Sequence, residues 1–547
     1  MGSRGLPARA DREPAERQWV RRDLALAGVT SAAVALAVTG GSLGPGVLLY
    51  RDFVGVPHPR WSPTTWGGGS APRAVPLDAV TTALSAVLPV GAQQQLMLLG
   101  SVLLASLGAA VLVRPWGPAS MVVAAVVAGW NPYVAERLLV GQPPTLLAYS
   151  MLPWVVVVVR SRLTGWRAAT ALLLAALPAA LTPWGGLTAG VATVVASLLT
   201  GHRRSARWLV TTGSLAVTWC LPWVVAALVH RQGAADPDGA RAFAAAADTP
   251  LGTLGSLLTL GGIWAPAARP GSRGTAVAVV AGLVLALLGA AALVRLARGP
   301  DRRLGPLVGA AWLGPVLLAW AVSAGPGLAP FAALQAVPGV AIGRDTHRWL
   351  APTALTAAVL LASLVARGSS RPAARPGQSR AHGTRRAAVA VALASLAVLS
   401  VPDLPGEVRG AYRPVTVPAD WQPAVDAAAR AAGDRALLVL PWQPFRRVPW
   451  AGPDPFLDPT SRAVPADVVA SRQLTVVRDG AVVVVDDDPA TLAALGGSDT
   501  LDAATLRRAG VSAVLVWKDT PGRVPVRGAG VVVERETPHF AVWAVTP

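Results

Sequence analysis

The sequence has few residues of the kinds that form disulfides, metal sites or reactive thiols. It contains one cysteine, Cys220, inside an apolar run, and six scattered histidines. One cysteine cannot form an intrachain disulfide, and these residues are not spaced as the ligands of a zinc site. The chain also has neither a Ser/His/Asp pattern for nucleophilic catalysis nor a glycine-rich phosphate loop. We therefore predict no metal site and name no certain cofactor, while a need for a divalent cation stays open.

Charged residues are also scarce, at 14% of the chain, and the basic ones are nearly all arginine because Lys518 is the single lysine. Apolar residues make up 53% of the chain and the mean hydropathy is +0.49. These values are typical of a polytopic membrane protein. The net charge of +19 is therefore not evidence for nucleic acid binding until its distribution is known.

Eleven apolar runs are long enough, some of them marginally, to cross about 30 Å of hydrocarbon. They follow an arginine-rich segment at residues 1–23, which we interpret as a cytoplasmic tail and not as part of a signal peptide. The predicted spans are residues 24–43, 93–113, 117–131, 143–160, 167–182, 185–200, 207–229, 275–297, 304–323, 349–366 and 387–401. The sequence thus predicts an α-helical membrane domain over residues 24–401, with a first outer loop at 44–92.

Arginines fall mainly on one side of these predicted spans. With a cytoplasmic N-terminus, the cytoplasmic connections hold more than twice as many arginines as the outer ones, although the outer ones are longer. Cytoplasmic loops of membrane proteins are enriched in Lys and Arg. We predict a multi-pass protein of the plasma membrane with its N-terminus inside, whose positive charge sets orientation and attracts anionic membrane lipid. Nucleic acid is not a predicted partner.

Acidic residues of the membrane domain have the opposite distribution. Asp301 is predicted to be cytoplasmic, whereas the other carboxylates between residues 24 and 401 face outside: Asp52, Asp78, Glu136, Asp236, Asp238, Asp248 and Asp345. A carboxylate at a membrane boundary is costly unless it is solvated or paired, so these residues point to function. Any chemistry is therefore predicted at the outer face.

Asp52 directly follows the first predicted span and is the candidate general base. The loop after it is rich in proline and glycine, which disfavours regular structure, and it carries Trp61 and Trp66, whose flat faces suit a sugar ring or the membrane interface. Residues 79–90 are expected to form a short helix along the membrane surface. In the simpler alternative, Arg51 and Asp52 only cap the first helix where it leaves the membrane.

A second notable stretch, residues 130–154, reads WNPYVAERLLVGQPPTLLAYSMLPW. Its Asn-Pro and Gly-Gln-Pro-Pro segments leave a short outer turn that contains Glu136 and Arg137. Successive residues point about 100° apart on a helix, so these two side chains are not expected to pair with each other. Glu136 is a candidate supporting acid. The alternative is an ordinary re-entrant turn with aromatic residues in the membrane interface.

These two stretches resemble the GT-C membrane glycosyltransferases. The resemblance rests on an outer Asp directly after the first span, a long first loop with a surface helix, and the pattern NPY...RLL.GQ...L.Y..LPW, and it covers residues 20–400. Within that superfamily, the stretches are most similar to the actinobacterial α-(1→3)-arabinofuranosyltransferase type. The chain departs from the usual pattern in having one Asp beside Arg51 in place of an acidic pair.

The resemblance implies transfer of a sugar, with arabinofuranose as one candidate, from a polyprenyl-phosphate donor to an envelope glycan or lipid acceptor. The phosphate is a competent leaving group, so one carboxylate, Asp52, suffices as base for an inverting displacement. The lipid phosphate needs cations at the membrane surface, where Arg can grip two oxygens. Three candidates for that role lie in the segment GVAIGRDTHRWLAP: Arg344, His347 and Arg348. A fourth candidate, Arg137, lies in the second stretch. Asp345 is expected to hold an Arg or to act as a second acid; the alternative is an interfacial anchor cluster.

The composition changes at residue 402, and residues 402–547 are predicted to form an outer α/β domain. Its expected strands are residues 436–440, 474–477, 481–485, 511–517, 530–534 and 540–545, with helices at 423–432 and 502–509. An aromatic and arginine-rich insertion at residues 442–467 would pack on the membrane domain or stack on glycan.

One alternative function is non-enzymatic: an envelope-lipid transporter or an assembly scaffold built on a GT-C-like fold. A transporter places ionisable residues near the middle of the membrane, but the predicted spans are almost free of charge. This favours chemistry at the outer face. Donor sugar, acceptor and linkage are not determined by the sequence.

Overall fold

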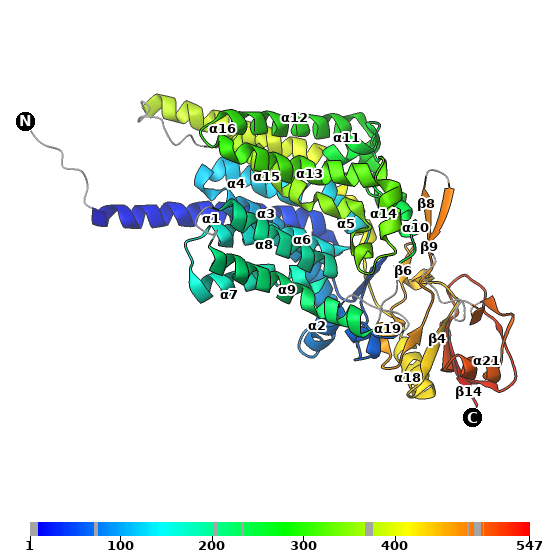
Figure 1. Ribbon diagram of the computed structural model, residues 1–547. Helices are drawn as coiled ribbons and strands as arrows, with labels where there is room; N and C mark the ends of the chain where they lie inside the picture. Colours follow the sequence, from blue (N-terminus) through cyan, green and yellow to red (C-terminus); the bar gives the residue numbers. More distant parts are fainter. Residues whose placement is uncertain are drawn as a thin grey trace, which may run out of the picture.

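The computed structural model describes residues 9–69, 75–200, 205–230, 235–366, 376–478, 481–485, 494–495 and 497–546. Residues 1–8 of the predicted N-terminal tail lie outside this part. Figure 1 shows a bundle of roughly aligned helices with the N-terminus beyond one end and a sheet-containing region at the other. The long helices are α1 (Arg9–Thr39), α3 (Val90–Leu112), α4 (Pro118–Gly129), α5 (Pro132–Leu139), α6 (Pro143–Arg160), α7 (Gly165–Ala176), α8 (Pro183–Leu199), α9 (Ala206–Val229), α12 (Ala276–Arg298), α13 (Gly305–Ser323), α15 (Ala351–Ser363) and α16 (Pro376–Leu399).

Helices occupy all eleven predicted apolar runs, but the expected count of spans is too high. Among the described residues, seven helices are long and apolar enough to cross a membrane, or eight if α16 and the following α17 (Leu404–Ala411), bent by 44°, form one span. The shortfall lies in α7, α8 and α15. The 12 residues of α7 and 13 of α15 rise about 18–20 Å, and the 17 residues of α8 rise about 26 Å, all less than roughly 30 Å of hydrocarbon. The equally short α4 counts as one span together with α5, Pro118–Leu139.

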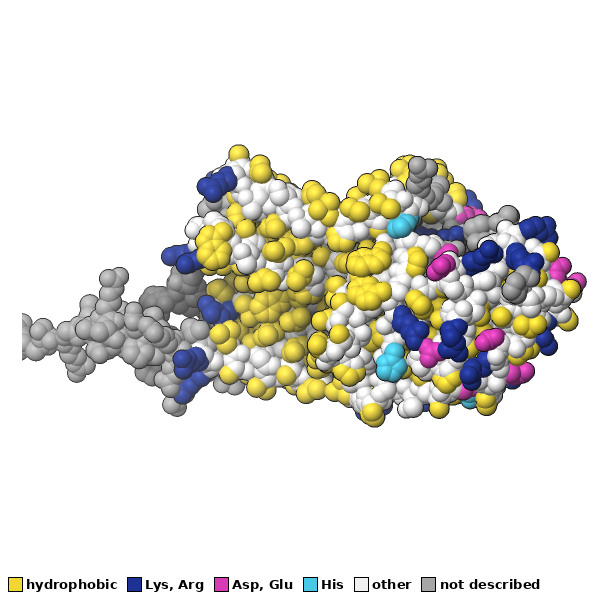
Figure 2. Space-filling view, turned by 90° about the horizontal axis from the view of Figure 1, so that it is seen from below, with side chains coloured by type: hydrophobic (Ala, Val, Ile, Leu, Met, Phe, Trp, Pro, Cys, Tyr) yellow, Lys and Arg dark blue, Asp and Glu magenta, His cyan; other side chains and the backbone are white. Residues whose placement is uncertain are grey.

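The helical region carries an apolar surface between two charged ends. In Figure 2 hydrophobic side chains cover the bundle, basic side chains lie at both of its ends, and acidic side chains lie toward the C-terminal region. Leu36, Val210 and Leu287 are more than half exposed on α1, α9 and α12, which soluble proteins seldom allow for a contiguous patch. The chain is therefore a helical membrane protein; its orientation in the membrane stays a prediction.

The C-terminal region contains a mixed five-stranded sheet in the order β13–β14–β11–β4–β7, in which β4 is parallel to β7 and β11, and β14 is antiparallel to β11 and β13. Side chains alternate across it: Leu437 and Val439 face the core beneath α18 (Trp421–Ala432), whereas Leu438 and Leu440 face that beneath α21 (Ala503–Arg508). The predicted strands and helices of this region are found. The strands are β3 (Pro414–Val415), β4 (Ala436–Leu440), β5 (Phe445–Arg446), β6 (Phe456–Leu457), β7 (Val468–Val469), β8 (Leu474–Arg478), β9 (Ala481–Val485), β10 (Thr500–Leu501), β11 (Val511–Trp517), β12 (Val526–Arg527), β13 (Val531–Glu536) and β14 (Phe540–Val545).

Short helices line the end of the bundle that meets the sheet region. They are α2 (Leu77–Leu84), α10 (Asp238–Ala242), α11 (Gly252–Leu258), α14 (Leu328–Leu334) and α19 (Thr460–Ala463). The surface helix expected at 79–90 is thus present as α2 but is shorter and ends at Leu84, before Pro89 and the start of α3.

The first loop begins with a β-hairpin that the sequence interpretation missed. β1 (Val47–Tyr50) pairs antiparallel with β2 (Phe53–Val54) on one side and with β3 on the other. The high proline and glycine content of the loop disfavoured regular structure, but those residues lie after Val54, where η2 (Pro63–Trp66) is the one regular element described between residues 55 and 69. The hairpin exists because β3, from far along the chain, supplies its second edge.

Candidate active site

Asp52 is placed by the two-residue turn of this hairpin. Arg51 adopts a left-handed backbone conformation with φ +47°, as such tight hairpin turns require. The strain is offset by the C-terminal region, because Arg51 N donates to Pro455 O at 2.9 Å and Leu457 N donates to Arg51 O at 2.7 Å. The carboxylate of Asp52 is exposed at the hairpin tip.

The turn between α5 and α6 packs directly against the hairpin tip. Gly141 has φ +83°, and a Cβ there would lie 2.8 Å from Arg51 Cβ and 3.0 Å from the backbone nitrogen of Asp52. Only glycine permits both this conformation and this approach. The approach brings Gln142, which precedes α6, within reach of the Asp52 carboxylate, and Gln142 Nε2 donates to Asp52 Oδ2 at 3.1 Å.

Gln142 also joins Asp52 to a pair of arginines. Its Oε1 accepts from Arg348 Nη2 and Arg137 Nη1, both at 3.1 Å, and from Arg348 Nε at 3.3 Å. Asp345 holds both arginines from the other side: Arg137 Nη1 lies 2.6 Å, and Arg348 Nε 3.2 Å, from Asp345 Oδ2. The result is a chain of contacts from one exposed base to two fixed cations.

The two arginines keep the carboxylate of Asp345 ionised at neutral pH. Burial alone would raise the pKa of Asp345, but the charges of Arg137 and Arg348 outweigh it and hold that pKa at about 2. Asp345 is therefore ionised and paired with both arginines, and the roles expected for it stay predictions. Arg348 keeps 23% of its side chain exposed, whereas Arg137 is fully buried.

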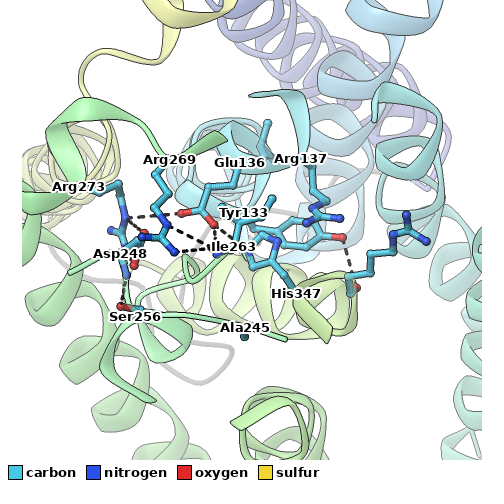
Figure 3. Close-up of polar contacts among 12 residues, drawn as sticks. Tyr133, Glu136, Arg137, Ala245, Asp248, Ser256, Ile263, Arg269, Arg273 and His347 are labelled. Atoms are coloured by element: carbon cyan, nitrogen blue, oxygen red, sulfur yellow. Dashed lines mark hydrogen bonds and ion pairs between the residues drawn. The ribbon is translucent and has the colours of Figure 1, made fainter. Parts of the chain in front are cut away.

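A second, fully buried cluster lies next to the first (Figure 3). Glu136 Oε2 accepts from Ile263 N at 2.8 Å and lies 3.1 Å from His347 Nε2. Asp248 pairs with Arg273 at 2.7 Å, and Arg273 Nε is 4.0 Å from Glu136 Oε1. Successive residues thus diverge as expected: Glu136 and His347 turn into this cluster, while Arg137 and Arg348 turn toward Asp52.

The side chains of this second cluster carry little net charge for a buried group of four. Burial, together with the charge of Arg137, lowers the pKa of His347 to about 3, so its imidazole is neutral at pH 7. Burial would raise the pKa of Asp248, but Arg273 and a hydrogen bond with Glu136 hold it well below its usual range. The cluster joins α5 to the segments around residues 248, 273 and 347 and so fixes the backbone that carries Arg348.

Other predicted residues lie apart from Asp52. Arg344 stacks over Phe243, with its Cζ 4.3 Å from the ring centroid. Trp61 precedes η2 and Trp66 is its last residue. Their rings stack with centroids 5.2 Å apart and an interplanar angle of 11°, and the two residues are 47% and 58% exposed. The structure thus brings together Asp52, Arg137, Asp345 and Arg348, places Glu136 and His347 behind them, and leaves Arg344 outside.

Three site residues were missed by the sequence interpretation. Gln142 was noted only as part of a turn, and its bridging role depends on contacts over more than 90 residues of chain. Asp78 and Arg462 form an ion pair at 3.3 Å and, like Asp52, line a pocket beside the hairpin. In the sequence, the one indication of this pair was that Asp78 is among the carboxylates predicted at the outer face.

Within the described part of the chain, no group of three or more His, Cys, Asp or Glu side chains could hold a metal ion. Glu136 and Asp248 are neighbours, but Arg273 occupies the position between them that a cation would need.

No protein-family model and no curated protein sequence matches this chain. Solved structures do. The arabinofuranosyltransferase AftD from mycobacteria matches with a TM-score of 0.58 and 19% sequence identity, over 96% of this chain and 40% of AftD. One structural class of its mutant R1389S matches with the same TM-score and 18% identity. The fold is GT-C-like. The chain thus spans about two fifths of the length of AftD, and identity at this level establishes the shared fold alone.

The archaeal oligosaccharyltransferase AglB from Archaeoglobus fulgidus, solved with an inhibitory peptide and a dolichol-phosphate, matches with a TM-score of 0.36 and 11% identity over 92% of this chain and 69% of AglB. That likeness is too weak to support an inference. The GT-C-like fold agrees with the resemblance drawn from the two sequence stretches, whereas the arabinofuranose specificity that the resemblance implied stays a prediction.

Proposed function

We propose that this GT-C-like protein is a cell-envelope glycosyltransferase. It transfers a sugar, with arabinofuranose as the first candidate, from a polyprenyl-phosphate donor to a glycan or lipid acceptor at the outer face of the membrane. The fold shared with AftD supports the reaction class. The observation that carries the proposal is the bridge through Gln142, which sets an exposed carboxylate, Asp52, beside a partly exposed cation, Arg348.

In the proposed reaction Asp52 accepts the proton of the acceptor hydroxyl. The acceptor oxygen then forms a bond to the anomeric carbon while the bond from that carbon to the phosphate oxygen breaks. The polyprenyl phosphate leaves with the bonding electrons, and its added negative charge needs cationic donors. No separate acid is required because the phosphate leaves as a stable anion.

Arg348 is the proposed contact for the phosphate. Its guanidinium is partly exposed and is held by Asp345, so little freedom is lost when it binds an anion. Arg137 and His347 are fully buried, and we assign them the task of fixing Arg348 in place. Arg344, which stacks on Phe243, would reach the phosphate only after leaving that ring.

The test compares purified wild type with Asp52→Asn for transfer from a panel of polyprenyl-phosphate sugars to envelope glycan acceptors. Loss of a positioned base is expected to lower kcat by about 10²–10⁴-fold with little change in donor KM. Asp238→Asn is the matched control, because Asp238 is a half-exposed acid of another outer connection that pairs with Arg241. Both variants are checked for equal folding.

Full activity in Asp52→Asn would refute the base assignment. Absence of transfer by the wild type from every donor would refute the enzyme proposal and favour the non-enzymatic alternative, an envelope-lipid transporter or assembly scaffold.

A further inference from the structure

A pocket opens beside the hairpin, and part of its wall comes from the C-terminal region. Its lining includes Asp52 and Phe53 of the hairpin, Asp78 and Thr81 of α2, and Ser461 and Arg462 of α19. Residues nearly 400 positions apart in the chain therefore share one cavity with the proposed base. The rest of the lining comes largely from apolar side chains, from two threonines of η2 and from two glutamines of α3.

The α19 segment is docked on the first loop by several hydrogen bonds. The hydroxyls of Ser62 and Thr64 donate to Ser461 O at 3.4 and 3.2 Å, and Arg60 N donates to Arg462 O at 2.8 Å. Arg462 Nε and Nη2 both lie 3.3 Å from Asp78 Oδ1. Asp78 thus holds the guanidinium of Arg462 at the pocket.

Three buried polar side-chain atoms of α19 have no hydrogen-bond partner among the described residues: Thr460 Oγ1, Ser461 Oγ and Arg462 Nη1. Of these residues, Ser461 and Arg462 line the pocket. Leaving such donors unpaired costs free energy, so an unpaired pair beside a pocket indicates a missing partner. That partner must offer oxygen acceptors.

The net charge of the side chains that line the pocket favours a neutral oxygen-bearing ligand over an anionic one. The charged side chains of the lining are Asp52, Asp78 and Arg462, which sum to one negative charge. A phosphate would be repelled by the carboxylates, whereas a neutral sugar can accept from Arg462 and Ser461, donate to Asp52, and place its C–H face on Phe53 and neighbouring apolar groups.

We propose that Ser461 and Arg462 form a subsite for the hydroxyls of a neutral polyhydroxylated acceptor, the end of a glycan chain, with Asp78 as the positioning residue for Arg462. This inference rests on the proposed function. The C-terminal region then takes part in acceptor selection, and the donor phosphate binds elsewhere, on the Arg348 side of Asp52.

The first measurement is equilibrium binding of short neutral oligosaccharides of pentoses and hexoses to the purified full chain, without any donor. Arg462→Gln and Ser461→Ala are each expected to weaken binding, Arg462→Gln by about tenfold or more, while Arg462→Lys retains part of it. Arg60→Gln is the matched control. Arg60 pairs with Asp426 and so also ties the first loop to the C-terminal region, but it does not line the pocket.

The second measurement is the kinetics of transfer, where Arg462→Gln is expected to raise the acceptor KM and leave the donor KM unchanged. Equal losses in Arg462→Gln and Arg60→Gln, or no binding of any oligosaccharide by the wild type, would overturn the subsite. Binding that depends on Arg462 without transfer from any donor would sustain the subsite and refute the glycosyltransferase. Transfer with an unchanged acceptor KM in Arg462→Gln would sustain the enzyme and refute the subsite.

Discussion

Single residues explain how the site holds its charges at fixed positions. Guanidinium groups only donate hydrogen bonds, so the Oε1 atom of Gln142 has to face Arg137 and Arg348. The amide nitrogen is then turned toward Asp52, where it donates to the carboxylate. One side chain therefore sets both the rotamer of the proposed base and its spacing from the cations.

Gln142→Glu is expected to move the acid limb of the pH–rate profile upward, by about one pH unit or more, because a second carboxylate beside Asp52 disfavours its ionised form. Gln142→Asn is expected to lower kcat by about tenfold, since the shorter amide cannot span both partners. The measurement is kcat as a function of pH.

Gln443→Glu is the control for Gln142→Glu, because Gln443 is an amide in the C-terminal region that donates to Pro521 O. An unshifted profile in Gln142→Glu would show that this amide does not act on Asp52.

At the scale of elements, the site depends on the contact between a hairpin tip and a helix–helix turn. The sequence predicts α6, which begins with proline, but it assigns the residues around Glu136 to a short outer turn. The structure has α5 there, with Asn131 accepting from Val134 N as its N-cap and proline at its start. The sequence also predicts the long strands of the C-terminal sheet, whose apolar residues are nearly continuous. It does not predict β1 and β2, because their pairing partner β3 lies some 360 residues away.

Gly141→Ala is expected to destabilise the protein by about 1–3 kcal/mol and to lower transfer, because it combines a left-handed backbone with a clash against the hairpin tip. Thermal unfolding in detergent, together with the transfer assay, measures both effects. Gly100→Ala in α3 is the control, since a Cβ at Gly100 meets nothing within 4 Å. Equal stability of the two variants would contradict the role given to Gly141.

At the scale of the whole molecule, the buried cluster around Glu136 and His347 makes stability depend on pH. His347 is neutral in the fold, where its pKa is lowered to about 3, but it takes up a proton in the unfolded chain below its usual pKa of about 6.5. Protonation of His347 in the unfolded chain therefore lowers the stability of the folded state as pH falls below about 6.5, by at most about 1.4 kcal/mol per pH unit. Glu136 acts in the opposite direction, because burial and the charge of Asp248 raise its pKa well above the usual value in the fold. The Asp345 pairs add a further loss between about pH 4 and pH 2.

His347→Gln is therefore expected to lose less stability than the wild type as pH decreases from 7 to 5, so the Tm of the variant should fall less, or rise more, than that of the wild type. Scanning unfolding measured at each pH provides the test. His58→Gln is the control because His58 is exposed. Glu136, Asp248 and Arg137 face His347 in the wild type and stay in both variants, so a slope unchanged by His347→Gln would assign the pH dependence to them.

The sequence by itself determined that this is a helical membrane protein with a mixed sheet near its C-terminus, because burial of apolar runs and strand alternation are local patterns. It also singled out Asp52, Arg137, Asp345 and Arg348, since the predicted spans are almost free of charge and these residues lie in the connections between them. The tertiary structure alone decided which of these residues meet, that three apolar helices are too short to span, and that Gln142, Ser461 and Arg462 join the site. Hydrogen bonds and ion pairs between distant segments depend on how the helices and the sheet pack together, which no local pattern specifies.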